Sequence, residues 1–546
     1  FATSDGSATA RQLRSTFITV DSGAAVDLKP TSELTFTTSG GAQYYYKQFD
    51  EVFGQGLVCA IPGPCDVDGS ANISAAEGFQ ENKTLGFYVQ EQLNWRDRVF
   101  LTAALRRDDN SAFGSNFDAA SYPKFGLSWV VGEEPFMSSL GFLSQLRVRG
   151  AWGRAGQQPD IFSAIQTYEP VVGFGGVGGV TPQNLGNPDL KPEIGEEVEL
   201  GFDAGLWNDR VGVEFTYYNK KVKDAILSIP IKPSRGFPGN QFTNIGETKN
   251  SGIELAVDVT PVSRDNVGLD LRFTYASNDS KITDLGGVPP SITPNAGAFI
   301  QQFFVEGYAP GGYWYKNVVS STITPIPVAG IPLPIGLDPM CEGGDLIPGS
   351  TILGVPNGTV VPCAEAPQLY QGRPTPSWYG SFSADLRLGR RFRLLGVVDY
   401  LGGHMVQVGD VSAIHHFFFS SKAILEGTSE VLAGRLGTEL LLGDGGETWG
   451  MSGMFDGGFM KLRTIAASYE LPASLTRFVG ASRGSFTLSA ENLAILWRGQ
   501  KDNFGVEWVD PEINPNRVDN GASFYTYTQE SWPQMMRIRG MLRLTF

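Results

Sequence analysis

The chain has 546 residues, and its net charge of −15 argues against a nucleic-acid partner, because phosphate neutralisation needs basic clusters and none stands out. With 41% hydrophobic residues, 12% aromatics, 68 Gly and 33 Pro, the composition favours many strands joined by many turns. No apolar run approaches the ~18 residues that a transmembrane helix requires, so a membrane-spanning form of this chain would have to be a closed β-barrel.

Apolar and polar residues alternate along a series of segments that we expect to form strands. In the first pair, Arg14–Leu28 and the run that starts at Glu33, apolar side chains recur at even positions such as Ile18, Val20, Leu34 and Phe36, and Lys29–Ser32 forms the turn. Around Arg463–Ala467 the alternation is unclear and predicts no face. The further segments that we expect to form strands are Thr84–Asn94, Val99–Asp109, Lys124–Gly132, Gln145–Gly156, Glu193–Ala204, Arg210–Lys223, Lys249–Thr260, Asn266–Asn278, Ser377–Leu388, Phe392–Leu401, Phe459–Leu471 and Ser485–Leu493.

The last strand of this series is Met536–Phe546. Its even positions are apolar, whereas Arg537, Arg539 and Arg543 occupy odd positions. About ten residues with this period can cross a membrane as a tilted strand. By itself this strand resembles either the final strand of a bacterial outer-membrane barrel, which ends in an aromatic residue, or an edge strand of a soluble sandwich.

The connections between the segments favour the barrel, because short turns alternate with loops of tens of residues. This asymmetry is typical of outer-membrane barrels, which have short periplasmic turns and long extracellular loops. The long loops are expected at Phe49–Lys83, Gln157–Asn187, Asp279–Thr375, Gly402–Phe455 and Leu493–Trp532. Aromatic residues near strand ends could form an interfacial girdle or pack a soluble core; they include Tyr44, Tyr45, Tyr46, Trp95, Trp207, Tyr217, Tyr218 and Tyr400.

We therefore predict an all-β protein, a transmembrane antiparallel β-barrel in the outer membrane of a Gram-negative bacterium. About fifteen strands are counted, and an odd antiparallel set cannot close without a parallel seam. The sequence also begins with Phe1 rather than Met, which indicates a processed or incomplete chain. We expect roughly seven further strands before Phe1, which would give a barrel of about 22 strands, the size of plugged transporters.

The four cysteines, Cys59, Cys65, Cys341 and Cys363, fall into two pairs that are near in sequence and lie within Gly- and Pro-rich segments. Neither pair has the Cys-x-x-Cys spacing or the nearby His of a zinc site. Disulfides in loops are the favoured interpretation, and they imply an oxidising compartment.

Several short motifs resemble those of SusC/RagA-like TonB-dependent outer-membrane receptors. Asn187–Glu193 (N-P-D-L-K-P-E), followed by Glu199 and Gly201, resembles the family pattern N-P-x-L-K-P-E with a later E-x-G. The other matching stretches are Asn250–Glu254, Phe455–Arg463, Tyr469–Pro472, Glu491–Leu493 and Asp510–Glu512. The resemblance covers nearly the whole chain, and it implies that residues 1–546 are the carboxy-terminal part of a receptor barrel. The plug domain, the TonB-contacting box and the first strands are absent from this sequence.

The resemblance implies an importer of oligosaccharides, peptides or similar large nutrients. Its expected partners are the outer-membrane lipids, a SusD-like surface lipoprotein that lids the extracellular mouth, the TonB complex acting through the missing plug, and the amino-terminal portion of the barrel. Loop aromatics could stack on sugar rings or contact the lid, or they could hold their own loops together; the candidates are Tyr313, Trp314, Tyr315 and Trp497. A structural or adhesive barrel of the same lineage is the alternative.

No catalytic, cofactor-binding or metal-binding residue is predicted. A hydrolase would need a Ser, His and acid arrangement, for which there is no visible candidate. Asp510 and Glu512 could bind calcium or take part in acid–base chemistry, but two acids in a Pro turn indicate a loop organiser. The adjacent His415 and His416 would point apart in an extended segment. Gly173–Gly179 lacks the Lys-Ser/Thr of a phosphate-binding loop and is expected to be an extracellular loop.

Overall fold

The structure is a computed structural model, in which most of the chain is described. The described residues are 6–59, 66–287, 291–292, 301–328, 331–344, 356–408, 429–438, 447–500, 502–503, 506–507, 510, 512, 527–528 and 534–546.

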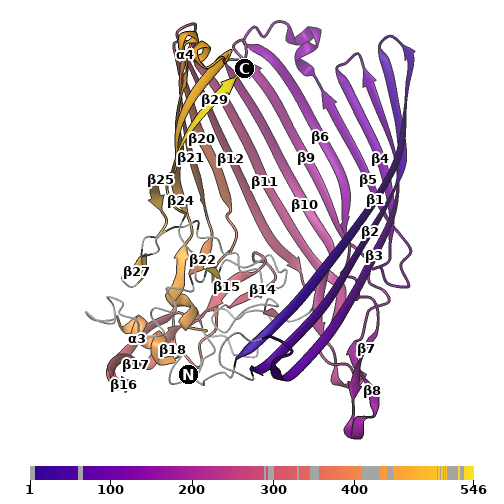
Figure 1. The fold of residues 1–546 in the computed structure, drawn as a ribbon, viewed down its shortest axis with the longest axis vertical. Helices are drawn as coiled ribbons and strands as arrows, with labels where there is room; N and C mark the ends of the chain where they lie inside the picture. The colour runs from indigo at the N-terminus through magenta and orange to yellow at the C-terminus, as the bar shows by residue number, and fades with distance from the viewer. Residues whose placement is uncertain are drawn as a thin grey trace. The chain divides into compact units, whose positions relative to one another are not determined.

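Fifteen strands form one sheet in which neighbours in sequence are almost always neighbours in space (Figure 1). The strands, in their order across the sheet, are β1 (Ser7–Thr31), β2 (Leu34–Cys59), β3 (Ser70–Trp95), β4 (Val99–Asn110), β5 (Ala120–Trp129), β6 (Leu143–Gln157), β9 (Glu193–Leu206), β10 (Val211–Pro230), β11 (Asn240–Arg264), β12 (Val267–Asp284), β20 (Trp378–Leu388), β21 (Phe392–Gly402), β24 (Phe459–Glu470), β25 (Arg483–Arg498) and β29 (Arg537–Thr545). The prediction of about fifteen strands is confirmed.

Small sheets and short helices occupy the connections between the strands of the large sheet. The hairpin β7 (Thr167–Val172) and β8 (Gly178–Asn184) follows β6, and the helix α4 (Ala473–Phe478) precedes β25. Besides short 3-10 helices, the other described elements are β13 (Ser291–Ile292), β14 (Gln302–Phe304), β15 (Gly312–Tyr315), β16 (Val318–Val328), β17 (Ile331–Glu342), β18 (Val360–Pro362), β19 (Leu369–Gly372), β22 (Met405–Val408), α3 (Glu430–Gly437), β23 (Met454–Asp456), β26 (Asp502–Asn503), β27 (Val506–Glu507) and β28 (Tyr527–Thr528).

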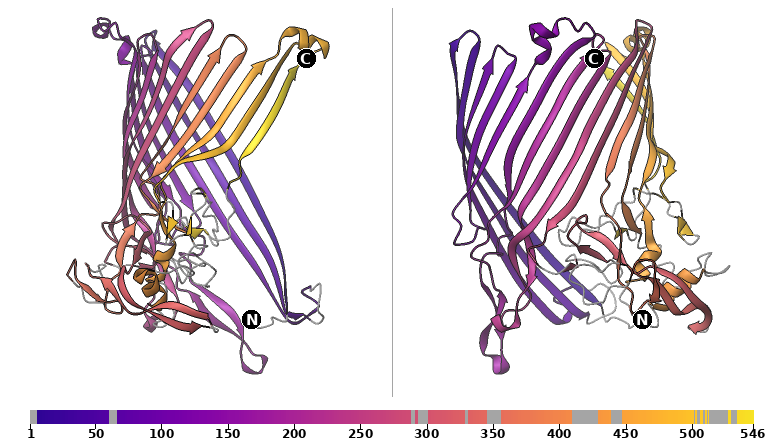
Figure 2. Two further views of the ribbon diagram at one scale, coloured as in Figure 1. Left: turned by 90° about the vertical axis from the view of Figure 1, so that its left-hand side faces the viewer. Right: turned by 180° about the vertical axis from the view of Figure 1, so that it is seen from behind.

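The chain divides into two compact units. The first comprises Phe1–Trp129, Gly150–Val198 and Lys221–Gly246, and the second comprises Val130–Arg149, Glu199–Lys220 and Glu247–Phe546. Within the first unit, β1, β2 and β3 run side by side (Figure 1). Within the second unit, β25 pairs with the carboxy-terminal β29, drawn in yellow in Figure 2. Every strand pair of the large sheet whose register is described is antiparallel.

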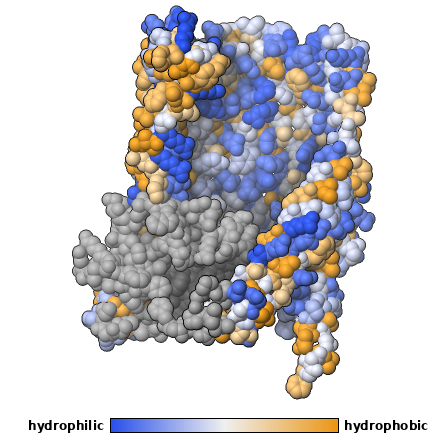
Figure 3. All heavy atoms as spheres, in the orientation of Figure 1, coloured by the Kyte–Doolittle hydropathy of each residue, from blue (hydrophilic) through white to orange (hydrophobic). Residues whose placement is uncertain are grey.

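The two faces of the sheet differ in polarity, as the alternation predicts. In the second unit, Asp258 pairs with Arg272 and Thr274 pairs with Ser381 on one face, whereas Phe273 pairs with Phe382 on the other. Figure 3 shows hydrophilic residues gathered over the face of β10, β11 and β12 that is turned toward the viewer. We call the two surfaces the polar face and the apolar face.

Several strands are longer than predicted, and one predicted long loop is largely strand. β2 extends to Cys59 and β3 begins at Ser70, so most of the expected loop Phe49–Lys83 is a paired ladder from Phe49/Gln80 to Cys59/Ser70. This part of the hairpin lacks strict alternation of apolar and polar residues. The sequence therefore gave no strand signal there, although backbone pairing continues.

Local backbone geometry explains two other features of the sequence. The unclear alternation near Arg463 coincides with a register shift between Leu462 and Thr464 in the β24–β25 ladder, and a β-bulge of this kind changes which face the following side chains occupy. Arg96 and Asp97 both have positive φ angles of about 55°, as a tight two-residue hairpin turn requires.

The connection after β12 contains a small disulfide-linked sheet. β16, β17 and β18 pair antiparallel, and helix α3 packs against β16 and β17. Cys341 and Cys363 are joined by a disulfide and are buried with Val318 and Ala366. This confirms the prediction for that cysteine pair. Cys59 also takes part in a disulfide, whereas Cys65 lies outside the described residues.

Within the described part of the chain, no helix combines the length and apolar character needed to cross a membrane.

We expect reduction of the Cys341–Cys363 disulfide to loosen the β16–β17–β18 sheet. The two cysteines are 22 residues apart. A cross-link over such a loop stabilises the folded sheet by about 3 kcal/mol, because it lowers the conformational entropy of the unfolded chain. In a Cys341→Ser/Cys363→Ser variant, amide hydrogen exchange should accelerate in β16 and β17 and stay unchanged in β20 and β21. Equal exchange in both proteins would show that the disulfide does not hold this sheet.

Candidate functional site

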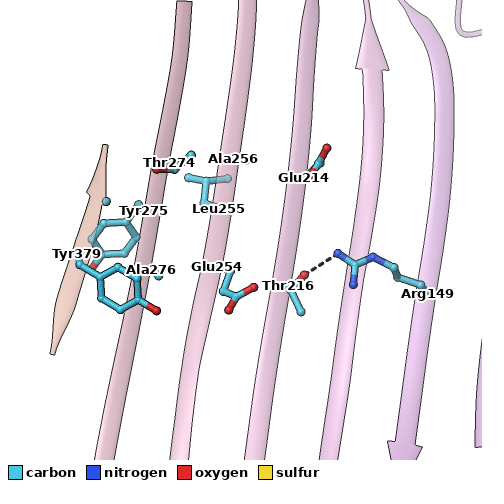
Figure 4. Close-up of a pocket in the computed structure, with 11 residues that line it drawn as sticks. Arg149, Glu214, Thr216, Glu254, Leu255, Ala256, Thr274, Tyr275, Ala276 and Tyr379 are labelled. Atoms are coloured by element: carbon cyan, nitrogen blue, oxygen red, sulfur yellow. Dashed lines mark hydrogen bonds between the residues drawn. The ribbon is translucent and has the colours of Figure 1, made fainter. Parts of the chain in front are cut away.

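A cavity of about 300 Å³ opens in the sheet of the second unit. Its lining includes Arg149 from β6, Glu214 and Thr216 from β10, Glu254 from β11 and Tyr379 from β20 (Figure 4). The lining residues come from five strands, β6, β10, β11, β12 and β20, so the cavity exists only in the assembled sheet. We call it the wall cavity.

A glycine lets one side chain reach across a whole strand to form this cavity. Arg149 donates from Nη2 to the Thr216 hydroxyl at 2.6 Å (Figure 4). β9 lies between these two strands in the sheet, and Gly201 on β9 provides the passage. A Cβ on Gly201 would lie 3.2 Å from Cζ of Arg149 and 2.5 Å from the carbonyl oxygen of Phe215. Gly201 is the glycine of the E-x-G part of the motif, so its place in that pattern has a steric reason.

One charged group of the wall cavity is paired with an opposite charge, and two are not. The guanidinium of Arg149 also lies 3.5 Å from a carboxylate oxygen of Asp203, so its charge is compensated. By contrast, Glu214 and Glu254 are exposed and have no ion pair within the described part of the chain. The cavity therefore presents two free carboxylates and the phenol of Tyr379, whereas the hydroxyl of Thr274, which also lines it, is already hydrogen-bonded to Ser381. These groups can accept hydrogen bonds from hydroxyl, amide or ammonium donors.

A second cluster joins a loop to β24 through buried charges. Lys461 is buried, and its ammonium lies 3.3 Å from Asp510 and 2.9 Å from Glu512. Asp510 also accepts from the backbone N–H groups of Glu512 and Gln534. Burial raises the pKa of Glu512, but hydrogen bonds from Arg463 and Lys461 lower that pKa more, so it lies below its ordinary value.

Arg463 connects this loop to two further strands. Its Nε donates to Asp399 on β21 at 2.7 Å, and its Nη1 donates to Glu512 at 2.7 Å and to Asn492 on β25 at 3.0 Å. Three of the motif stretches, Phe455–Arg463, Glu491–Leu493 and Asp510–Glu512, therefore meet at one guanidinium. The arrangement satisfies the carboxylates with cations and backbone donors, which supports the interpretation of Asp510 and Glu512 as loop organisers.

The N-P-D-L-K-P-E motif holds loops together in the first unit. Leu190 is completely buried, and its carbonyl accepts from the Gly114 N–H. Lys191 forms an ion pair with Asp224 at 2.9 Å, and Glu193 accepts from the Ile226 N–H. These contacts fit a structural role.

Three of the four candidate aromatics lie inside their own loop. Tyr313, Trp314 and Tyr315 on β15 are buried, and β15 pairs with β14 and β19. Trp314 contacts Tyr308, with ring centroids 4.8 Å apart. Burial favours the alternative in which these residues hold the loop together. Trp497, near the end of β25, is 46% exposed and remains accessible to a ligand or lid, which stays a prediction.

Of the three histidines, only His404 is described, and His415 and His416 lie outside the described residues. His404 follows β21, is 8% exposed, and its Nδ1 has no hydrogen-bond partner. Burial lowers the pKa of His404 to about 4, and nearby Asp456 opposes this shift only in part. Within the described residues, no group of three or more His, Cys, Asp or Glu side chains is placed to hold a metal ion.

Sequence reasoning did not mark Arg149, Glu214 or Thr216 as site residues, and it named Glu254 only as part of the Asn250–Glu254 stretch. On its strand, each of these residues alternates with apolar residues and so lies on the polar face. This polarity was the available indication in the sequence. Many residues share this signal, and only the register between strands distinguishes those that line the wall cavity.

We expect Lys461→Met to destabilise the protein strongly, because it leaves Asp510 buried without its cation. Removing one partner of a buried pair costs about 3–5 kcal/mol. The matched control is Arg272→Met, because the Arg272–Asp258 pair is about half exposed and should be worth less than about 1 kcal/mol. Urea unfolding in detergent micelles measures both. Equal losses for the two variants would contradict the buried role of Lys461.

Acidification should loosen the segment around His404. Because the pKa of His404 is lower in the folded state than its ordinary 6.5, the unfolded segment binds the proton first. Stability is therefore lost as the pH falls from about 6.5 toward 4, by at most ~1.4 kcal/mol per pH unit. Hydrogen exchange of β22 and β23, corrected for intrinsic rates, should accelerate at pH 5 in the wild type and much less in His404→Gln. The same acid response in both proteins would exclude His404 as its source.

Comparisons with known proteins agree with this fold. Residues 2–325 match the family model described as TonB dependent receptor-like, beta-barrel. TonB-dependent receptor P39 of Formosa agariphila is 30% identical over 233 residues, which is 42% of this chain and 22% of that protein. TonB-dependent receptor P3 of the same organism is 23% identical over 83% of this chain and 44% of that protein. TonB-dependent receptor SusC of Bacteroides thetaiotaomicron is 27% identical over 54% of this chain and 31% of that protein.

The solved structure of the RagAB peptide transporter is similar in fold, with a TM-score of 0.75 at 17% identity, over 98% of this chain and 56% of that one. This chain spans less than half the length of the curated relatives that it matches. The family model covers more than half of the chain. The chain thus belongs to the TonB-dependent receptor-like β-barrel family, is SusC/RagA-like within it, and is an outer-membrane protein with many membrane-spanning strands.

Proposed function

We propose that this chain forms part of an outer-membrane importer that is TonB-dependent and takes up oligosaccharides, peptides or similar large nutrients. The observation that carries the proposal is the wall cavity, with two unpaired carboxylates on the polar face of the sheet. In a barrel of this family, the polar face lines the lumen. A lumen wall with free hydrogen-bond acceptors suits passage of hydroxyl- and amide-rich solutes, and the membership in a receptor family supports transport.

We further propose that residues 1–546 are the carboxy-terminal part of the barrel. The plug domain and the first strands would belong to an upstream part of the polypeptide or to a separate chain, in a barrel of about 22 strands. The greater length of the related receptors supports this division. TonB would then act through the plug portion.

A SusD-like lipoprotein lid is the proposed extracellular partner. The similarity to SusC, and in fold to the RagAB peptide transporter, supports this pairing. Trp497 is the candidate aromatic best placed to contact a ligand or lid, because it is about half exposed. We propose no catalytic activity, since the family consists of receptors and transporters.

The test is nutrient uptake by cells that express the full native polypeptide. Deleting its gene should reduce consumption of either an oligopeptide mixture or an oligosaccharide mixture by at least about tenfold, and a protonophore should have the same effect. Co-purification should recover a plug-containing portion and a surface lipoprotein. If consumption of both mixtures is unchanged while cell adhesion or envelope integrity falls, the structural or adhesive alternative replaces import.

Within an active importer, Glu214→Gln/Glu254→Gln should change uptake several-fold at unchanged abundance in the membrane, because it removes both free carboxylates of the wall cavity. The control is Asp209→Asn, which removes a charge from the short turn after β9, where the positive φ of 59° also suits Asn. An unchanged uptake rate in the double variant would exclude the wall cavity from the path of the solute.

A further inference from the structure

The apolar face of the second unit carries a short helix. Helix α4 belongs to the connection between β24 and β25, and its Thr476 is buried. A Cβ on Gly484 of β25 would lie 2.9 Å from the methyl carbon of Thr476 and 3.0 Å from the side chain of Leu544 on β29. Gly484 lies on the same face as Phe486, two positions along the strand. The helix is therefore seated on the apolar face, at the same end of the sheet as the carboxy terminus (Figure 1).

The motif stretch Tyr469–Pro472 leads the chain into this helix. The Leu471 N–H donates to the carbonyl of Gly484 at 2.9 Å, which adds a last rung to the β24–β25 ladder. The carbonyl of Pro472 then accepts from the Leu475 N–H at 2.9 Å and closes the first helical turn. The motif thus has a local role, because it turns the chain from the end of β24 onto the apolar face.

The outer side of α4 is apolar and exposed. Phe478 is 91% exposed, Leu475 58% and Val479, directly after the helix, 49%. Because about 3.6 residues make one turn, Leu475 and Val479 lie on one flank of the helix, and Arg477 lies on the opposite flank. Figure 3 shows hydrophobic residues gathered around α4. Three large apolar side chains side by side favour a surrounding other than water.

The connection that contains α4 lies at the edge of the membrane. In a barrel of this family the apolar face contacts lipid, and the short turns lie on the periplasmic side. The β20–β21 turn is one of these short turns, and the carbonyl of its Arg391 accepts from the Glu470 N–H at 2.8 Å, at the end of β24. α4 follows directly, so it lies at the periplasmic boundary of the hydrocarbon. The periplasmic leaflet of an outer membrane consists of glycerophospholipids, whose phosphates lie at this boundary.

We propose that α4 is an interfacial anchor that binds glycerophospholipids of the periplasmic leaflet. Leu475, Phe478 and Val479 enter the acyl region. Arg477, on the opposite flank, binds a headgroup phosphate; it is exposed and has no ion pair within the described part of the chain. An amphipathic helix in this position buries its apolar side about 5–10 Å into the boundary between headgroups and acyl chains. This inference rests on the lipid-facing side of the sheet and does not depend on transport.

The experiment measures the depth of residue 478 in a bilayer. A nitroxide spin label is attached to a Phe478→Cys variant of the full native polypeptide, in vesicles of phosphatidylethanolamine and phosphatidylglycerol. The described cysteines are all in disulfides, so the new thiol takes the label. Oxygen concentrates in hydrocarbon, whereas a nickel chelate stays in water. The ratio of oxygen to nickel collisions should be at least about threefold higher than in Arg390→Cys, the control in the β20–β21 turn.

The role of Arg477 is tested in the same labelled protein. Arg477→Gln should raise nickel collisions at residue 478 about twofold in phospholipid vesicles, whereas Arg477→Lys should not, because lysine keeps the charge. In vesicles of digalactosyldiacylglycerol, which has no phosphate, Arg477→Gln should have no effect. An effect in both kinds of vesicle would mean that Arg477 acts through the helix dipole, and no effect in either would remove it from the site. Both results would overturn the assignment of the phosphate to Arg477.

Two further results would overturn the anchor itself. Equal collision ratios for the labels at residues 478 and 390 would place α4 in water. A label at residue 478 that is shielded from both reagents would mean that another part of the polypeptide covers α4. Heat-modifiable electrophoretic mobility reports whether each variant is folded, and Arg477 and Phe478 are exposed, so folding should be unaffected.

Discussion

Backbone hydrogen bonding in a medium without water is the constraint on which this structure depends. Inside a membrane, each unpaired N–H or C=O group costs several kcal/mol, so a spanning strand must have a neighbour on both sides. The meander order of the fifteen strands meets this requirement for every strand between β1 and β29, and the register of β1 on β2 continues without a shift from Leu28/Phe36 to Ser7/Leu57. The side chains are then free to differ between the two faces.

On the polar face, charges are mostly paired across neighbouring strands. Arg272 on β12 meets Asp258 on β11, and Arg147 on β6 meets Asp203 on β9 at 2.6 Å. Pairs of this kind are exposed and contribute little to stability individually, but they keep the wall hydrated and nearly neutral. The Lys461 and Arg463 cluster is different, because burial makes its ion pairs depend on one another and fixes a loop to three strands. These ion pairs therefore hold the loop against the sheet at β24.

The strands were predictable from sequence wherever one face of the sheet is apolar and the other is polar, because apolar and polar residues then alternate along the strand. β4 and β21 begin at the predicted residues, Val99 and Phe392. The extension of β2 and β3 toward Cys59 and Ser70 was not predictable, because the alternation is lost there. The wall cavity could not be predicted from sequence either. The contact of Arg149 with Thr216 depends on the order of three strands in the sheet and on the space left by Gly201. Asp510 and Glu512 were recognised as loop organisers, but their partner Lys461 is 49 residues away from Asp510 in sequence.

The residues that match the family motifs are mostly satisfied, although Glu254 of the Asn250–Glu254 stretch is unpaired within the described residues. Leu190, Arg463 and Asp510 are buried or fully paired, so their role is to hold strands and loops in place. Glu214 and Arg107 lack partners within the described chain, and the physical meaning of that differs between the faces. On the polar face, water can solvate the Glu214 carboxylate until a solute displaces that water. The free carboxylate is therefore compatible with transient binding of a solute. On the apolar face water is scarce next to hydrocarbon, so an unpaired charge such as that of Arg107 is tolerated only near the membrane boundary, where water reaches it.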